Sequence, residues 1–179
     1  MKITKIVVVI LLGVLLIYGL ACCPAQTGVN VYSKYGFSFE YPHGVSIVEE
    51  GVYSATADDN SGMVAWVAGD GFYGISWEKM GIWNSGMAEL SIDAIILDLE
   101  SVGGVVELIG ENVTAPMSGL NVTYQIIKIV DGEESNGEVN GIIAEWRCEQ
   151  SAKILGAVFF VNITPRLHLE NFLATFRCQ

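Results

Sequence analysis

The sequence is short of basic residues, and this shortage removes one class of partner. Only 9 lysines and arginines stand against 20 aspartates and glutamates, which gives a formal net charge of −11 at pH 7. Removal of residues 1–21, which contain Lys2 and Lys5, leaves 7 of the 9 basic residues and a net charge of about −13. A surface this acidic repels nucleic-acid phosphates, so we expect no nucleic-acid partner. It remains compatible with basic protein partners.

Histidines are also scarce, and no serine lies in a G-x-S-x-G turn. A catalytic histidine needs a nucleophile and an orienting acid within reach. A zinc site built on His43 and His168 would need two more ligands from distant positions. We expect both histidines to be exposed surface residues. The sequence therefore predicts no catalytic residue, no cofactor and no enzymatic activity.

The four cysteines form no C-x-x-C metal or redox motif. Cys148 and Cys178 lie far from the other two and can close a disulfide in an oxidising compartment. Sequence alone leaves their pairing open, because a disulfide requires the two Cα atoms to come within bridging distance.

The chain begins with a segment typical of exported proteins. Lys2 and Lys5 precede an uncharged apolar stretch, Ile6–Ala21, which resembles a signal peptide and approaches the length of a membrane-spanning helix. The following "GLACC" resembles a lipobox with an imperfect match at both candidate lipidation sites, Cys22 and Cys23. A lipid anchor, an uncleaved helix and release after cleavage all remain open.

The segment sets the expected division of the chain. Residues 1–23 are the signal peptide or N-terminal membrane anchor, residues 24–31 a short linker, and residues 32–179 one folded domain. We expect the domain to be extracytoplasmic and held at the cell membrane by a lipid or by the uncleaved helix.

Alternating apolar residues predict a series of antiparallel strands. The stretch "KYGFSFEYPHG" places Phe37, Phe39 and Tyr41 on one face and ends at Pro42. Further strands are expected in the segments "VSIVEEG", "VYSATA", "MVAWVAG", "FYGISWE", "VVELIGENVTA", "NVTYQIIKIV", "EVNGIIAEWRCEQ" and "AKILGAVFFVNI".

Two segments have helical periodicity instead. In "LSIDAIILDLESVGG" the apolar residues follow helical spacing, with Ser91 as N-cap and Gly103 as the stop. In "TPRLHLENFLATF" Thr164 is the expected cap and Pro165 the first helical residue. The apolar face of this last helix consists of Leu169, Phe172, Leu173 and Phe176.

This order of elements resembles the PsbP/Mog1 group over about residues 31–178. The resemblance is carried by "YSKYGFSFEYP" at the start and "LHLENFLATF" at the end, while "HGVSI" stands where the group usually has a tryptophan. It implies an α+β fold, in which helices pack on the faces of an antiparallel β-sheet to form an α/β/α sandwich, and no general enzymatic activity. Photosynthetic members are accessory subunits of a membrane complex, and Mog1 binds a small GTPase. Because fold does not fix function, neither role transfers.

Three weaker signals remain. Acidic loops at Asp58, Asp59, Glu133 and Glu134 carry oxygen ligands for Ca²⁺ but lack EF-hand spacing, so ordinary turn chemistry and solvation are the preferred explanation. The sequons at Asn112, Asn121 and Asn162 are N-glycosylation candidates, although their alternation also fits plain strands. The four tryptophans, Trp66, Trp77, Trp83 and Trp146, can form the core or an exposed binding patch.

These observations predict an exported, membrane-tethered, non-enzymatic binding or assembly module. Its expected partners are the membrane, through the N-terminal segment, and a protein of the cell envelope. The alternatives are a hydrolase with an unrecognised active site and a Ca²⁺-dependent surface binder.

Overall fold

The computed structural model describes residues 28–52, 55–69, 71–81, 91–101, 104–131, 138–161 and 163–179. Within these residues the fold is mainly β, with two antiparallel sheets and two short helices. The N-terminal segment, with Cys22 and Cys23, lies outside the described residues. The expected division into anchor, linker and domain therefore remains a prediction.

The larger sheet has seven strands in the order β3-β4-β5-β9-β8-β7-β6. Most neighbouring strands of this sheet are consecutive in the sequence and pair with each other. The exception is β5, which pairs with the distant β9, so that Trp77 lies opposite Leu155. This long-range pairing joins the two halves of the chain at the centre of the sheet. The strands are β3 (Val48–Glu50), β4 (Ser61–Ala68), β5 (Gly71–Lys79), β6 (Gly104–Met117), β7 (Leu120–Asp131), β8 (Glu138–Cys148) and β9 (Lys153–Phe160).

The smaller sheet consists of β1 (Val29–Lys34), β2 (Phe37–Pro42) and β10 (Arg177–Cys178). Tyr35 and Gly36 form the turn between β1 and β2, with φ angles of 53° and 76°, which matches the positive φ values of a tight hairpin turn. Phe37 and Phe39 are buried, as their alternation predicts. The opening motif of the sequence is therefore a core strand.

The two helices begin where their sequence signals place them. In α2 (Ile92–Glu100) the Ser91 hydroxyl accepts a hydrogen bond from the Ala94 amide at 3.2 Å, which confirms the expected N-cap. In α3 (Pro165–Thr175) Pro165 is the first helical residue, as expected. Thr164 is the N-cap residue, as expected, but its backbone is left-handed and its side chain makes no capping hydrogen bond.

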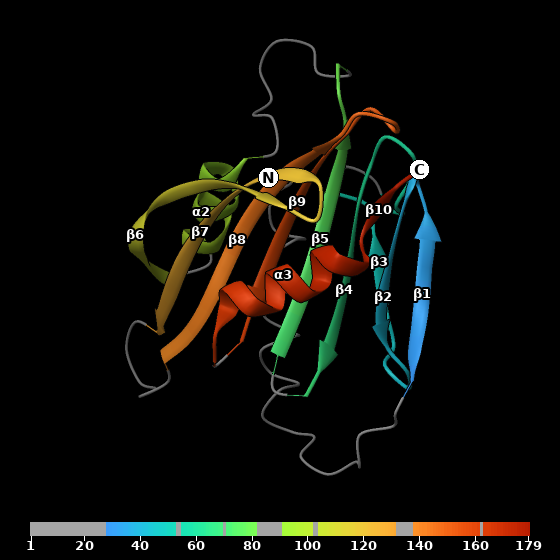
Figure 1. Ribbon diagram of the computed structural model, residues 1–179. Helices are drawn as coiled ribbons and strands as arrows, with labels where there is room; N and C mark the ends of the chain where they lie inside the picture. Colours follow the sequence, from blue (N-terminus) through green and yellow to red (C-terminus); the bar gives the residue numbers. More distant parts are fainter. Residues whose placement is uncertain are drawn as a thin grey trace.

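Two apolar clusters hold the layers together. The larger cluster joins the seven-stranded sheet to the smaller sheet and to α3, whose Leu169, Phe172, Leu173 and Phe176 are all buried. The smaller cluster contains Ile92, Ile95 and Leu99 of α2 together with residues of the seven-stranded sheet. Figure 1 shows α3 lying across the seven-stranded sheet, with the β1–β2 hairpin beside it.

The expected α/β/α sandwich is wrong. Two sheets account for most of the described residues, and the two helices are only 9 and 11 residues long. The layer that was expected to be helical is shared by α3 and the β1-β2-β10 sheet, because the aromatic residues of β1 and β2 bury their rings as a hairpin. The segment "VYSATA" was also expected to be a strand, but its described residues are bends and irregular chain.

Candidate functional site

A groove opens where the β1–β2 hairpin, the β4–β5 hairpin and α3 meet. Its volume is about 240 Å³ and most of its lining is apolar. We call it the α3 groove. Four of its residues are tyrosine, tryptophan or phenylalanine. Two of them form a stack in its wall: Trp66 and Tyr73 have ring centroids 5.4 Å apart and an interplanar angle of 7°. The lining residues are Val29, Glu40, Tyr41, Pro42, Trp66, Ala68, Tyr73, His168, Asn171, Phe172 and Thr175.

A tyrosine–histidine pair closes one side of the α3 groove. The Tyr73 hydroxyl and the His168 Nδ1 lie 2.9 Å apart and share a hydrogen bond, whose direction depends on the histidine tautomer. Both side chains are half-buried. The sequence analysis placed His168 on the exposed polar side of the helix. That expectation misses the contact because the two partners lie 95 residues apart in the chain.

The lining of the α3 groove also includes an acidic residue, Glu40. Glu40 is exposed, and in the described part of the chain its carboxylate has no ion-pair partner. Its backbone amide donates a hydrogen bond to the Thr175 Oγ1 at 3.2 Å, and that hydroxyl donates to the Phe172 carbonyl at 3.0 Å. Thr175 therefore joins α3 to β2 and uses its hydroxyl as both donor and acceptor.

The second histidine lies elsewhere. His43 is exposed in the turn after β2, and its backbone amide donates to the Gly28 carbonyl at 3.0 Å. It does not line the α3 groove. The structure thus brings His168 together with Tyr73 and Glu40 at one groove, but it does not bring the two histidines together there.

The first acidic loop has protein partners. The Asp58 carboxylate accepts hydrogen bonds from the amides of Asn60 and Ser61 at 2.7 and 2.9 Å. Asp59 pairs with Lys153 at 2.8 Å and with Lys79 at 3.4 Å, and the Lys153 hydrogen bond holds the pKa of Asp59 below its ordinary value. Glu133 and Glu134 lie outside the described residues.

No cluster of three or more histidine, cysteine, aspartate or glutamate side chains with metal-binding geometry occurs within the described ranges. The structure therefore gives the Asp58–Asp59 loop a role in turn formation and lysine pairing. The Ca²⁺ hypothesis for this loop receives no support from its contacts.

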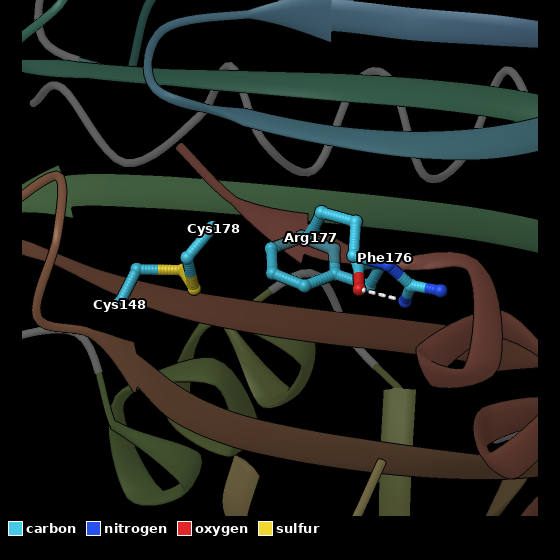
Figure 2. Close-up of a disulfide and its surroundings, with 4 residues drawn as sticks. All are labelled: Cys148, Phe176, Arg177 and Cys178. Carbon is cyan, nitrogen blue, oxygen red and sulfur yellow. Dashed lines mark hydrogen bonds between the residues drawn. A yellow bond between two sulfur atoms is a disulfide. The ribbon is translucent and has the colours of Figure 1, made fainter. Parts of the chain in front are cut away.

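Cys148 and Cys178 form a disulfide, with their Cα atoms 5.5 Å apart. The bond connects the end of β8 to β10 and so fixes the C-terminus against the seven-stranded sheet. Figure 2 shows the neighbouring residues, in which the Arg177 guanidinium donates to the Phe176 carbonyl at 2.6 Å. The Cys148 side chain is fully buried.

Two of the three sequons lie on the β6–β7 hairpin. Asn112 and Asn121 are both exposed, and Asn162 lies outside the described residues. The sequon hydroxyls of Thr114 and Thr123 face each other across the two strands at 3.0 Å. This cross-strand pair gives both N-V-T segments a structural explanation, and glycosylation of either asparagine remains a prediction.

Three tryptophans belong to the core. Trp66, Trp77 and Trp146 are 5, 0 and 2% exposed, whereas Trp83 lies outside the described residues. The Trp77 Nε1 donates to the Asp58 carbonyl at 2.9 Å. Of these three tryptophans, Trp66 also lines the α3 groove.

A second, polar cavity of about 560 Å³ lies near the start of α2. Its most informative residue is Glu145 on β8, whose carboxylate accepts the Ile92 amide at 3.1 Å and so caps the first turn of α2. Sequence reasoning missed this contact, because 53 residues separate the two partners. The remaining lining residues are Ser91, Gly119, Leu120, Asn121, Thr123, Trp146, Arg147, Glu149, Gln150 and Ile154.

Neither α2 nor α3 has the length and apolar character needed to cross a membrane. The apolar N-terminal segment is outside the described residues. Lipidation at Cys22 or Cys23 therefore stays a prediction.

Comparison with solved structures identifies the fold. The structure is similar to the solution structure of cyanobacterial PsbP (CyanoP) from Synechocystis sp. PCC 6803, with a TM-score of 0.59 and 13% sequence identity. The match covers 89% of this chain and 99% of that one, and it confirms the expected PsbP-like fold.

A protein of unknown function from Pseudomonas aeruginosa, PA94, matches with a TM-score of 0.34 and 9% identity over 80% of this chain and 89% of that one. This similarity is too low to support an argument about fold or function. The sequence matches no protein-family profile and no curated protein.

Proposed function

We propose that this chain with a PsbP-like fold is an exported, membrane-tethered module that binds a protein partner and does not catalyse a reaction. The observation that carries the proposal is the way in which the polar groups of the α3 groove are already used. The Tyr73 hydroxyl shares a hydrogen bond with His168. The Thr175 hydroxyl accepts a hydrogen bond from the Glu40 amide and donates one to the Phe172 carbonyl. The lining that remains is mostly apolar and aromatic, as in many binding sites.

In a hydrolase, His168 would act as a base beside a nucleophile. Nucleophilic catalysis needs a serine, cysteine or threonine hydroxyl or thiol that is free to attack, with a base beside it. Thr175 is the residue of this kind among the described residues that line the groove, and its hydroxyl already bonds the Glu40 amide and the Phe172 carbonyl. The hydroxyl beside His168 belongs to Tyr73. These contacts favour binding over the hydrolase alternative.

The proposed location rests on separate observations. The basic and apolar N-terminus has the layout of an export signal. The Cys148–Cys178 disulfide fits an oxidising compartment. The net charge of −11 keeps the domain itself away from anionic headgroups, so that tethering depends on the N-terminal segment.

The test is chemical crosslinking on intact cells. Full-length protein, expressed in a close relative of its native host, is treated with a membrane-impermeant crosslinker, purified with its attached neighbours and analysed by mass spectrometry. We expect one reproducible partner from the cell envelope. The matched control lacks residues 1–23 and should lose both the membrane fraction and the partner.

Two results would contradict the proposal. If the crosslinker reaches the protein only after cells are broken, the chain is not exported. If the crosslinker reaches it on intact cells but traps no neighbour above background, the binding role is wrong and the location stands.

A further inference from the structure

We propose that the outward face of the β1–β2 hairpin lies on the lipid bilayer to which the chain is tethered. The inference rests on the tether of the proposed function and specifies which surface of the domain meets the membrane. We call this surface the hairpin face. It consists of the residues of β1 and β2 that alternate with the buried aromatic ones: Val29, Val31, Ser33, Ser38, Glu40 and Pro42.

The hairpin face is apolar at one end and polar at the other. Residues directly opposite in an antiparallel pair lie on the same face of a sheet. The three opposite pairs, in order from the start of β1, are Val29 with Pro42, Val31 with Glu40 and Ser33 with Ser38. Val29 and Val31 are 61 and 63% exposed, although the solvent face of an antiparallel strand is usually polar. The exposed apolar residues therefore gather at the end where the chain enters the fold.

The tether that leads to this end is short. The chain is bonded to the end of β2 from Gly28 onward, because the His43 amide donates to the Gly28 carbonyl at 3.0 Å. Gly28 is the fifth residue after Cys23 and the seventh after Ala21. An extended chain of these lengths spans at most about 18 Å from a lipidated Cys23 and about 25 Å from the end of an uncleaved helix.

The size of the domain turns this length into a restriction. A compact domain of about 150 residues has a radius of gyration of about 15 Å and hence a diameter of about 40 Å. The tether is shorter than this diameter, so it cannot bring the side of the domain that lies away from Gly28 to the bilayer. The surface around Gly28, which includes the apolar end of the hairpin face, is the one that the tether holds at the membrane.

This restriction distinguishes between two exposed apolar surfaces. The second surface belongs to β6 and consists of Val105, Leu108, Ile109 and Val113. Figure 1 shows β1 at one side of the molecule and β6 at the opposite side. Exposed apolar residues mark surfaces that bind something, and the short tether selects the hairpin face as the one that meets lipid.

The contact needs little affinity of its own. Two valines and a proline bury little apolar surface, so the hairpin face alone binds a bilayer weakly. A short tether holds the domain at the bilayer with an effective concentration of about millimolar, which is enough to populate a weak contact. Glu40 is the one acidic residue of the hairpin face, so little of the net charge of −11 lies on it.

The α3 groove opens beside the hairpin face, because Val29 and Pro42 belong to both. A bilayer against the hairpin face therefore brings the groove close to the membrane. This position favours a membrane-embedded protein as the partner in the proposed function.

The experiment uses the full-length protein in nanodiscs of phosphatidylcholine. A small fraction of the lipid carries a photoreactive diazirine near the glycerol end of one acyl chain, and labelled residues are mapped by mass spectrometry after irradiation. We expect the protein to co-elute with the nanodiscs. Besides the N-terminal segment, labelling should appear at Val29, Val31 and Pro42, about tenfold more strongly than at Val105 and Leu108 of β6.

Two valine variants make the matched comparison. Val31→Glu should reduce labelling of Val29 and Pro42 about tenfold, because a carboxylate placed at the interface loses part of its hydration. Val105→Glu makes the same change at another strand valine, which is 53% exposed, and should leave this labelling unchanged. Circular dichroism and melting temperature show whether both variants are folded. The labelling map of the unmodified protein keeps the test decisive if Val31→Glu does not fold.

The outcomes separate this inference from the proposed function. If the full-length protein does not co-elute with nanodiscs, the tether is wrong and the inference falls with it. Co-elution with labelling confined to the N-terminal segment, or with equal labelling of β1 and β6, would overturn the inference and leave the tether in place. Equal labelling of a folded Val31→Glu variant and the unmodified protein would show that nearness to the bilayer, without contact through the hairpin face, causes the labelling, and would also overturn it.

Discussion

Lys153 has a buried side chain, and the carboxylate with which it pairs, that of Asp59, is exposed. Its side chain is 1% exposed, whereas the side chain of Asp59 is 62% exposed. Lys153 also donates to the Asp59 carbonyl at 2.5 Å. The pair is therefore asymmetric, because loss of the aspartate leaves an unpaired charge inside the protein and loss of the lysine leaves a carboxylate that water can solvate.

This asymmetry predicts different effects of two substitutions. Asp59→Asn should lower the free energy of unfolding by about 1 to 3 kcal/mol, because the buried ammonium loses its counter-charge. Lys153→Met, which keeps the length of the side chain, should change it by less than about 1.5 kcal/mol in either direction. Urea unfolding followed by tryptophan fluorescence measures both values. A larger loss for Lys153→Met than for Asp59→Asn would show that the lysine is held by something other than this pair.

Protonation of Asp59 should also contribute to the acid sensitivity of the protein. The Lys153 hydrogen bond lowers the pKa of Asp59 in the folded state, so the folded protein binds a proton less readily at this site than the unfolded chain does. The contribution is fully present above the unfolded pKa of about 3.9 and is lost as the pH falls through the lower folded value. The difference in unfolding free energy between the unmodified protein and Asp59→Asn should be constant from about pH 5 to pH 7 and should shrink below about pH 4.

Asp98 provides a control, because its pKa is shifted in the opposite direction to that of Asp59. Burial raises the pKa of this α2 carboxyl, so its ionisation opposes folding above the unfolded pKa. Asp98→Asn should therefore be more stable than the unmodified protein near neutral pH, with an advantage that declines as the pH falls through the raised folded value toward the unfolded one. If both variants show the same pH dependence, general acid unfolding is responsible and the assignment to Asp59 is wrong.

At the scale of the element, the last helix depends on a covalent connection. The Cys148–Cys178 disulfide closes a loop with a sequence separation of 30 residues, which includes β9 and α3. The loop-entropy relation assigns a closed loop of this length a stabilisation of about 3 to 4 kcal/mol. The double substitution Cys148→Ala and Cys178→Ala should lower the unfolding free energy by about this amount.

Chemical reduction of the unmodified protein supplies the second measurement. A reducing agent should lower the melting temperature of the unmodified protein and leave that of the double alanine variant unchanged. A loss below about 1 kcal/mol on both routes would mean that packing alone holds the C-terminus. Phe176 gives a physical reason for that outcome, since its ring packs on Trp146 at 5.2 Å and on Phe37 at 5.8 Å.

The helix α3 shows which features of a helix can be predicted from the sequence. The start and buried face of α3 were predictable because Pro165 and the spacing of its apolar residues act within a few positions. The cap position was also predictable, whereas the left-handed backbone of Thr164 and the missing side-chain bond were not. The α3 groove was not predicted from the sequence. His168 was expected to be an exposed surface residue, because its groove neighbours Tyr73 and Glu40 come to it from other elements.

At the scale of the whole molecule, the predicted fold was right in its strands and wrong in its layers. The sequence pattern predicted β2, β4 and β5, although their burial does not alternate strictly: the first six residues of β4 are all buried, because this strand is covered on both faces. It could not show that β1 and β2 leave the main sheet and form a second one, since sheet membership depends on partners far away in sequence. The same limit applies to the pairing of β5 with β9, in which Trp77 lies opposite Leu155.

That sheet order predicts how stability is distributed over the molecule. In the order β3-β4-β5-β9-β8-β7-β6, the strands β5, β9 and β8 are paired on both sides, whereas β3 and β6 each have one edge without a partner strand among the described residues. Several apolar residues of β6 are also exposed, among them Val105, Leu108 and Ile109 at 53, 56 and 47%. Amides at a free edge open without disruption of the core, while those of central strands open only with global unfolding.

Hydrogen exchange read by mass spectrometry should therefore rank the strands by their place in the sheet. We expect peptides from β5, β8 and β9 to exchange at the rate of global unfolding, and peptides from β3 and β6 to exchange much faster. The β10–α3 region should join the slow group while the disulfide is intact and exchange faster after reduction, because the covalent link then no longer adds to the packing of this region on β8. Protection of β6 equal to that of β9 would contradict the free edge and would indicate that β6 pairs with another molecule in solution. Dilution distinguishes the two cases, because protection from pairing between molecules falls with concentration and protection within one molecule does not.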